Sequence, residues 1–143
     1  MRLIEGEGRS YLRNTDQKFD LIHMSLPITK SYRNYGNQEL VENYLFTHEA
    51  IGEYRRALAP GGQMIVVTHY RNELLRLVTN TLKSFEDDGI TIPEAMKQIA
   101  TIGSDANPTL ILKNGVMDES EIGTYYVIVD RFSQRGTTNF IPF

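Results

Sequence analysis

Residues 58–69 read LAPGGQMIVVTH and place a helix terminator directly before a buried strand. Proline cannot continue a helix and glycine accepts a reversed backbone, so residues 59–62 (APGG) predict the end of a preceding helix. Residues 63–69 have β-branched side chains at their centre, which predicts a buried strand. A helix that stops where such a strand starts is typical of an α/β protein.

The segments before this stretch alternate in the same way. The sequence predicts a strand at 2–6, a helical turn at 8–14, a second strand at 20–25 and a long loop at 26–37. A helix is predicted at 39–58, since apolar side chains recur at helical spacing on one face: Leu40, Tyr44, Ile51, Tyr54 and Leu58.

The segments after it extend the alternation. Asn72 is the predicted N-cap of a helix at 72–85 that Gly89 terminates, and Pro93 suits the first position of a short helix at 93–98. Two further strands are predicted, at 99–103 and 109–113.

The segment after residue 117 carries two conflicting signals. Asp118 and Glu121 have the spacing of a capping box, which predicts the start of a helix. Residues 125–129 (YYVIV) are aromatic and β-branched, and by propensity alone they would form a strand. The cap favours the helix.

Composition restricts the function classes. The 143 residues fit one domain, and 41% hydrophobic and 23% charged residues are typical of a soluble globular protein. The absence of cysteine excludes disulfides, thiolate zinc sites and cysteine nucleophiles, and together with the absence of an export signal it leads us to expect a cytoplasmic protein. The net charge of −3, without a dense Lys/Arg cluster, argues against a nucleic-acid partner. The sequence has no apolar run long enough to span a bilayer, so we expect no membrane contact.

Four short motifs occur in an order found in a known family. They are GEGR at 6–9, FDLI at 19–22, LFTHEAI at 45–51 and LAPGG at 58–62. Over residues 2–86 the chain thereby resembles the spermidine synthase-like (aminopropyltransferase) branch of the class I S-adenosylmethionine-dependent methyltransferases. The resemblance implies a partial Rossmann-like, mostly parallel sheet flanked by helices and lacking the first two strands. It further implies that residues 1–143 form a single α/β domain, the C-terminal portion of a larger spermidine synthase-like catalytic domain.

The sequence departs from the family at two places. The glycine-rich turn after the family's first strand, which holds the cofactor, has no counterpart here. The family's aspartate-rich loop aligns with residues 25–29, where Ser25 and Ile28 stand at the two acidic positions. A serine without an adjacent base takes up a proton poorly at neutral pH, so the chain lacks the aspartates of aminopropyl transfer.

The resemblance and the ends of the predicted strands give a set of candidate site residues. It implies cofactor contacts at Glu7, Gly8, Ser25 and Pro27, and substrate contacts at Tyr32, Leu45 and Phe46. Ser25 and His69 are the candidate catalytic residues, because open α/β sheets bind ligands beyond the carboxyl ends of their strands and histidine titrates near neutral pH. Glu7 as a solvated loop residue and Ser25 as a turn cap stay open as alternatives. Ligand spacing for a metal is absent.

Three functions stay open at this point. The first is a transferase that binds S-adenosylmethionine or its decarboxylated form, with a small nucleoside as ligand. The second is a non-catalytic interaction or assembly module that retains the α/β frame, and the third is an independent nucleotide-binding domain. Without the family's first two strands, segments 2–6 and 20–25 would be left with unpaired edges, so we expect them to pair with each other or with another chain. The expected partner is a second copy in a homo-oligomer or the remainder of a longer chain.

Overall fold

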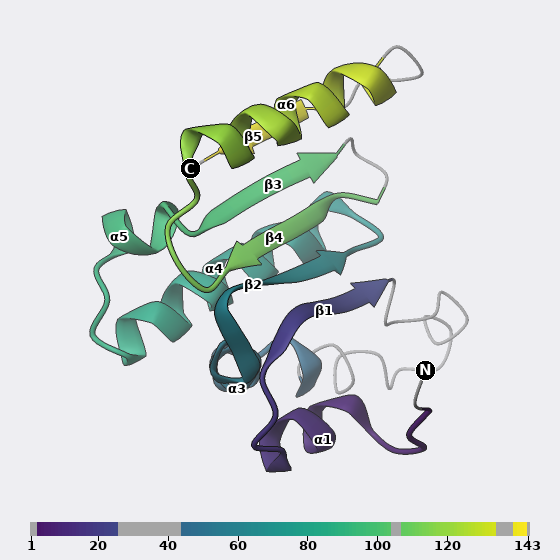
Figure 1. The fold of residues 1–143 in the computed structure, drawn as a ribbon, viewed down its shortest axis with the longest axis vertical. Helices are drawn as coiled ribbons and strands as arrows, with labels where there is room; N and C mark the ends of the chain where they lie inside the picture. The colour runs from purple at the N-terminus through teal and green to yellow at the C-terminus, as the bar shows by residue number, and fades with distance from the viewer. Residues whose placement is uncertain (1–2, 26–43, 104–106, 134–138, 143) are drawn as a thin grey trace.

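The structure, a computed structural model, describes residues 3–25, 44–103, 107–133 and 139–142 of the chain (Figure 1). Helices and strands alternate over most of this length. The elements are α1 (Gly8–Asn14), β1 (Phe19–Ser25), α3 (His48–Ala57), β2 (Leu58–Val67), α4 (Arg71–Asp87), α5 (Ile92–Met96), β3 (Ile99–Gly103), β4 (Thr109–Lys113), α6 (Glu119–Ser133) and β5 (Asn139–Pro142).

Within the described residues the sheet has five strands in the order β1-β2-β4-β3-β5. β1 and β2 are parallel, while the pairs β2–β4, β3–β4 and β3–β5 are antiparallel. The expected α/β class, with helices flanking a sheet, is confirmed. β1, β2 and β3 run in one direction and β4 and β5 in the other, so the sheet is mixed rather than mostly parallel. Hydrophobic pattern locates strands but does not give their direction.

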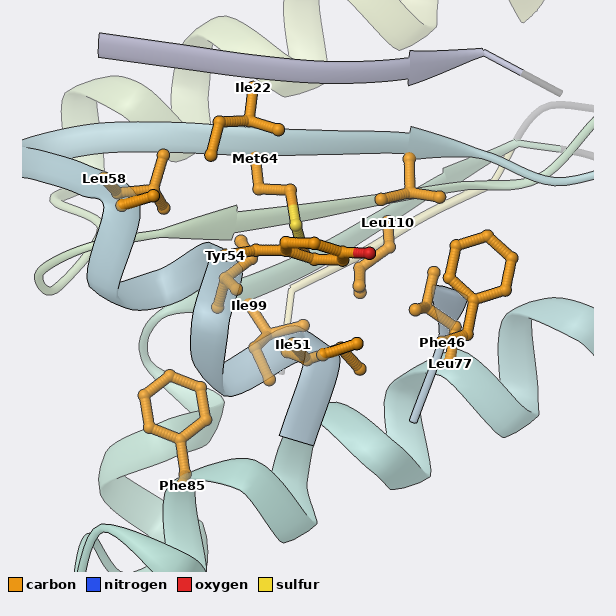
Figure 2. Close-up of a cluster of buried hydrophobic side chains, with 14 of the residues drawn as sticks. Ile22, Phe46, Ile51, Tyr54, Leu58, Met64, Leu77, Phe85, Ile99 and Leu110 are labelled. Carbon is orange, nitrogen blue, oxygen red and sulfur yellow. The ribbon is translucent and has the colours of Figure 1, made fainter. Parts of the chain in front are cut away.

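One face of the sheet carries the main core. Its largest fully buried side chains come from α3, α4 and the strands, and Figure 2 shows the ring of Tyr54 in the middle of the cluster. Buried members that the figure labels are Ile22, Phe46, Ile51, Tyr54, Leu58, Met64, Leu77, Phe85, Ile99 and Leu110. Residues alternate between the two faces along a strand, so Leu110 and Leu112 point into this core and Ile111 points away from it.

The other face is covered by α6 over β3 and β4. Ala100, Ile111 and Met117 are buried there, with Ile122 and Tyr125 of α6 packed against them. The capping box predicts this helix correctly: Glu121 N donates to Asp118 Oδ1 at 2.9 Å, and Asp118 N donates to Glu121 Oε2 at 2.9 Å. Among the helices of the described segments, none is both long and apolar enough to cross a membrane.

Strand β2 starts earlier than the sequence predicts. Residues 58–62 continue the strand as an irregular segment, and the register with β1 shifts between Phe19 and Leu21. Asn114, just after β4, holds this segment: its N–H donates to Gly62 O, and its side-chain amide donates to the carbonyls of Leu58 and Ala59. The APGG sequence therefore ends α3 and bends β2 without interrupting the strand.

Two predicted elements are wrong at the amino-terminal side. Residues 3–6 form no strand and do not pair with residues 20–25, which pair with β2 instead, and Leu3 is 90% exposed. The predicted helix at 39–58 is interrupted in its described part: residues 44–45 are helical, and a separate helix, α3, begins at His48. Thr47 is extended there, and its side chain caps α3 by accepting from Ala50 N. Residues 39–43 and the predicted loop at 26–37 lie outside the described residues.

The bend in β2 makes Gly62 a position where any side chain costs stability. A Cβ there would lie 2.6 Å from Phe19 O and 3.0 Å from Ala59 O, both backbone atoms. We expect Gly62→Ala to lower the free energy of unfolding by about 1–3 kcal/mol, measured by urea denaturation.

Gly123→Ala is the matched control, since a Cβ on this α6 residue meets nothing within 4 Å. It is expected to raise stability by up to about 1 kcal/mol through helix propensity. Equal effects of the two substitutions would contradict the packing at Gly62.

Candidate functional site

The carboxyl ends of β1 and β2 lie next to each other because these strands are parallel. Ser25, the last residue of β1, is in register with Val67, the last residue of β2. Thr68 and His69 follow β2 directly, so His69 lies roughly 7 Å further along the strand direction than the Ser25 register. Ser25 is exposed and His69 half-buried. The structure thus brings the two candidate catalytic residues to one edge of the sheet.

Thr68 fixes the end of β2 against β4. Its backbone N–H and its hydroxyl both donate to Pro108 O, at 2.9 and 2.8 Å, and the residue is 2% exposed. Asn107 N donates to His69 O at 3.4 Å. The backbone at His69 is therefore fixed by hydrogen bonds to the residues that precede β4, and the sequence alone does not predict these contacts.

His69 is also tied to the start of α4. Its backbone N–H donates to Glu73 Oε2 at 2.8 Å, and its ring lies 6.1 Å from the ring of Tyr70, centroid to centroid. The predicted N-cap, Asn72, is wrong: α4 begins at Arg71, with Tyr70 as the N-cap residue. The backbone of His69 is thus fixed at the edge of the sheet where β1 ends in Ser25.

Glu7 is the N-cap of α1. Its Oε1 accepts from Arg9 N at 2.8 Å and its Oε2 from Ser10 N at 2.7 Å. Partial burial opposes ionisation, but the hydrogen bonds from Ser10 and Arg9 outweigh it and lower the pKa of Glu7. Glu7 has a structural role in starting the helix, whatever else it contacts.

Arg9 joins α1 to α3 through a contact between residues far apart in the chain, which no local sequence pattern predicts. Its guanidinium donates to both carboxylate oxygens of Glu53, at 2.8 and 3.2 Å, and to Tyr44 O, and lies over the Tyr44 ring at 4.5 Å. The Arg9 and Glu53 side chains are 10% and 12% exposed. The hydrogen bond from Arg9 lowers the pKa of Glu53, and the same bond raises the pKa of Arg9. This pair holds the Glu7–Gly8 turn in place.

Leu45 and Phe46 lie at the start of the α3 region. Phe46 is 7% exposed and belongs to the core, and its carbonyl accepts from the Asn80 side chain at 2.7 Å. Leu45 is half-buried, and its carbonyl accepts from the Tyr54 hydroxyl at 3.1 Å. Their substrate contacts stay predictions, and the predicted residues Pro27 and Tyr32 lie outside the described residues.

A groove of about 370 Å³ runs between the amino-terminal segment, α1 and the start of β1. Gly8 lines it together with Ile4, Gly6, Tyr11 and Phe19, so its walls are mainly apolar. Its volume falls within the usual range of ligand pockets, roughly 300–1,000 Å³. Gly8 borders this groove, but Ser25 does not line it.

No protein-family model matches the sequence, and no curated protein matches it either. In the described segments, no group of three or more His, Asp and Glu side chains is placed to hold a metal ion. The strand-end site therefore consists of a hydroxyl and an imidazole at one edge of the sheet, whereas the Glu7 carboxylate caps α1 beside the groove that Gly8 lines. In Figure 1, α1 runs back along β1, so its first residues lie toward the side at which β1 ends.

The Arg9–Glu53 pair makes stability depend on acid pH. The folded-state pKa of Glu53 lies below the ordinary value of 4.5, so its contribution is present above that pH and is lost as the pH falls through the lowered pKa. We expect Glu53→Gln to cost about 1.5 kcal/mol at pH 7 and to lose less stability than the wild type between pH 5 and pH 3. Urea denaturation across this range measures both effects.

Glu5→Gln is the control, because Glu5 is exposed in the segment before α1. Glu5→Gln is expected to lose as much free energy of unfolding between pH 5 and pH 3 as the wild type does. If Glu53→Gln lost as much free energy of unfolding between pH 5 and pH 3 as the wild type does, the pair would not couple α1 to α3.

Proposed function

We propose that the chain is a transferase-fold domain of the spermidine synthase-like type, which binds a nucleoside ligand at the carboxyl ends of β1 and β2. The observation that carries this proposal is the parallel β1–β2 pair, with Ser25 ending one strand and Thr68–His69 following the other. A crevice outside the carboxyl ends of parallel strands is the general ligand site of open α/β sheets.

The strand order supports the same proposal. β4 follows β3 in the chain, yet it lies between β2 and β3 and is antiparallel to both. A reversed strand at this place leaves β2 and β3 pointing in the same direction, as successive strands of a doubly wound α/β sheet do. β1, β2 and β3 thus run in one direction, which is compatible with the resemblance, while β5 adds an antiparallel strand beyond β3.

The residues present fit a nucleoside better than they fit aminopropyl transfer. Each Glu7 oxygen accepts one N–H in the cap and keeps a second lone pair, so Glu7 can still accept from a ligand hydroxyl or amine. Glu7, Gly8 and Ser25 would hold S-adenosylmethionine or its decarboxylated form, which supplies the group to be transferred. Ser25 can orient a partner, and His69 is the nearby group suited to move a proton.

A second function is favoured by the exposed side of β1. β1 lies at the edge of the sheet as described, and Leu21 on this strand is 55% exposed, with Ile4 at 44% before α1. Unpaired strand edges recruit other strands. The alternative is thus a non-catalytic module that retains the α/β frame and assembles through this edge.

Binding of nucleosides tests the first function. Isothermal titration with 5′-methylthioadenosine, S-adenosylmethionine and its decarboxylated form is expected to give a micromolar response with at least one of them. Ser25→Ala and His69→Gln are each expected to weaken that binding about tenfold, the effect of one lost hydrogen bond to a bound group. Ser120→Ala, at an exposed position on α6 away from the strand ends, is the matched control.

Sedimentation velocity on the same samples separates the two functions. A monomeric protein that binds a nucleoside would support the first function, a transferase-fold domain with a nucleoside ligand. Stable dimers with no heat from any of the three ligands would overturn it in favour of the assembly module.

A further inference from the structure

A second cleft, of about 270 Å³, lies between α1, the turn before β1 and the end of α3. Arg13 of α1, Thr15 and Lys18 of the turn, and Glu53 and Arg56 of α3 provide its polar lining. Lys18 precedes the first residue of β1, whereas Ser25 is its last. The cleft is therefore at the opposite end of the strand from the candidate functional site, roughly 20 Å away along β1.

The charge of this cleft is positive although the chain as a whole carries −3. Its one carboxylate, Glu53, is already neutralised by Arg9, at 2.8 and 3.2 Å, and is only 12% exposed. Arg13 lies at 3.9 Å from Glu53, the outer limit of an ion pair, with its own side chain 66% exposed. Arg13, Lys18 and Arg56 thus supply three positive charges beyond the Arg9–Glu53 pair.

The ends of two helices reduce this charge without cancelling it. Arg13 lies in the last turn of α1 and Arg56 in the last turn of α3, where basic residues ordinarily balance the helix dipole. Each helix end carries about half a negative charge, so the two together offset about one of the three cations. Lys18 Nζ donates one of its three ammonium hydrogens to Arg56 O, so two hydrogens remain for a ligand.

The donors around the cleft suit an oxyanion. Two guanidinium groups offer planar pairs of N–H donors, and the Lys18 ammonium offers a compact charge. The Thr15 hydroxyl accepts from Gln17 N at 3.2 Å and can donate its hydrogen to an anion. The volume is slightly below the roughly 300–1,000 Å³ of pockets for drug-sized ligands, which favours a single small group.

We propose that this cleft binds a phosphate group, either as the free ion or as the phosphate of a small phosphorylated metabolite, with Arg13, Lys18 and Arg56 as its charged contacts. The site does not depend on the proposed function, because none of its residues lies at the carboxyl ends of the strands. An anion bound here bridges α1 to α3 beside the Arg9–Glu53 pair.

Titration of the whole chain with inorganic phosphate tests the proposal. Phosphate is expected to raise the melting temperature and to shift the backbone amide signals of Thr15, Lys18 and Arg56, while sodium chloride at equal ionic strength does neither. Lys18→Gln and Arg56→Gln are each expected to weaken phosphate binding about tenfold or more, as charge-assisted contacts do. Their melting temperatures without phosphate show whether the fold is intact.

Lys97→Gln on the segment after α5 and Arg71→Gln at the start of α4 are matched controls, since both residues are exposed outside the cleft. Each is expected to bind phosphate like the wild type. The proposal is overturned if the cleft variants do so too, or if the shifted amides lie elsewhere. Glycerol 3-phosphate as a second probe separates the sources: binding of phosphate alone assigns the free ion, and binding of both assigns a phosphorylated metabolite.

Discussion

The parallel pairing of β1 with β2 is the constraint on which the rest of the structure depends. Parallel strands cannot be joined by a tight turn, so the chain between Ser25 and Leu58 has to cross one face of the sheet. Helix α3 completes that crossing and buries Ile51 and Tyr54 against the strands. The same pairing places the two carboxyl ends side by side, which gives the candidate functional site its geometry.

Helix α3 is joined to α1 and to α4 by charged groups on two of its sides. Glu53 binds Arg9 of α1, while Arg55 lies 3.6 Å from the centre of the Phe85 ring of α4 and donates to Ser84 O and Asp88. Burial lowers the pKa of Arg55, and Asp88 opposes that shift. A guanidinium that stacks and donates at once orients its partner more strictly than apolar packing does.

Local signals in the sequence predicted most elements. The strands at 99–103 and 109–113 have the predicted bounds, and the reciprocal Asp118–Glu121 cap outweighed the β propensity of the residues that follow it. The connection between those two strands is too short for a crossover, which needs about a dozen residues, so their antiparallel pairing was open to prediction. The strand at 139–142 was not predicted at all.

The candidate site was predicted only in part. Strand ends located Ser25 and His69, because position along a strand is a local property. The Arg9–Glu53 pair and the attachment of Thr68 to Pro108 join residues far apart in the chain, and no spacing rule reveals such contacts. The strand expected at 2–6 failed for the same reason, since pairing depends on a neighbour that the segment itself does not specify.

The capping box of α6 also has a consequence for the order in which the chain folds. Glu121 receives both the Asp118 N–H and the ammonium of Lys113, the last residue of β4, so helix and hairpin are joined by residues close in the chain. Contacts of low sequence separation close small loops at little entropic cost, whereas the β1–β2 pairing joins residues as distant as Phe19 and Leu58. We therefore expect the β3–β4–α6 unit to form before the edge that carries Ser25 and His69.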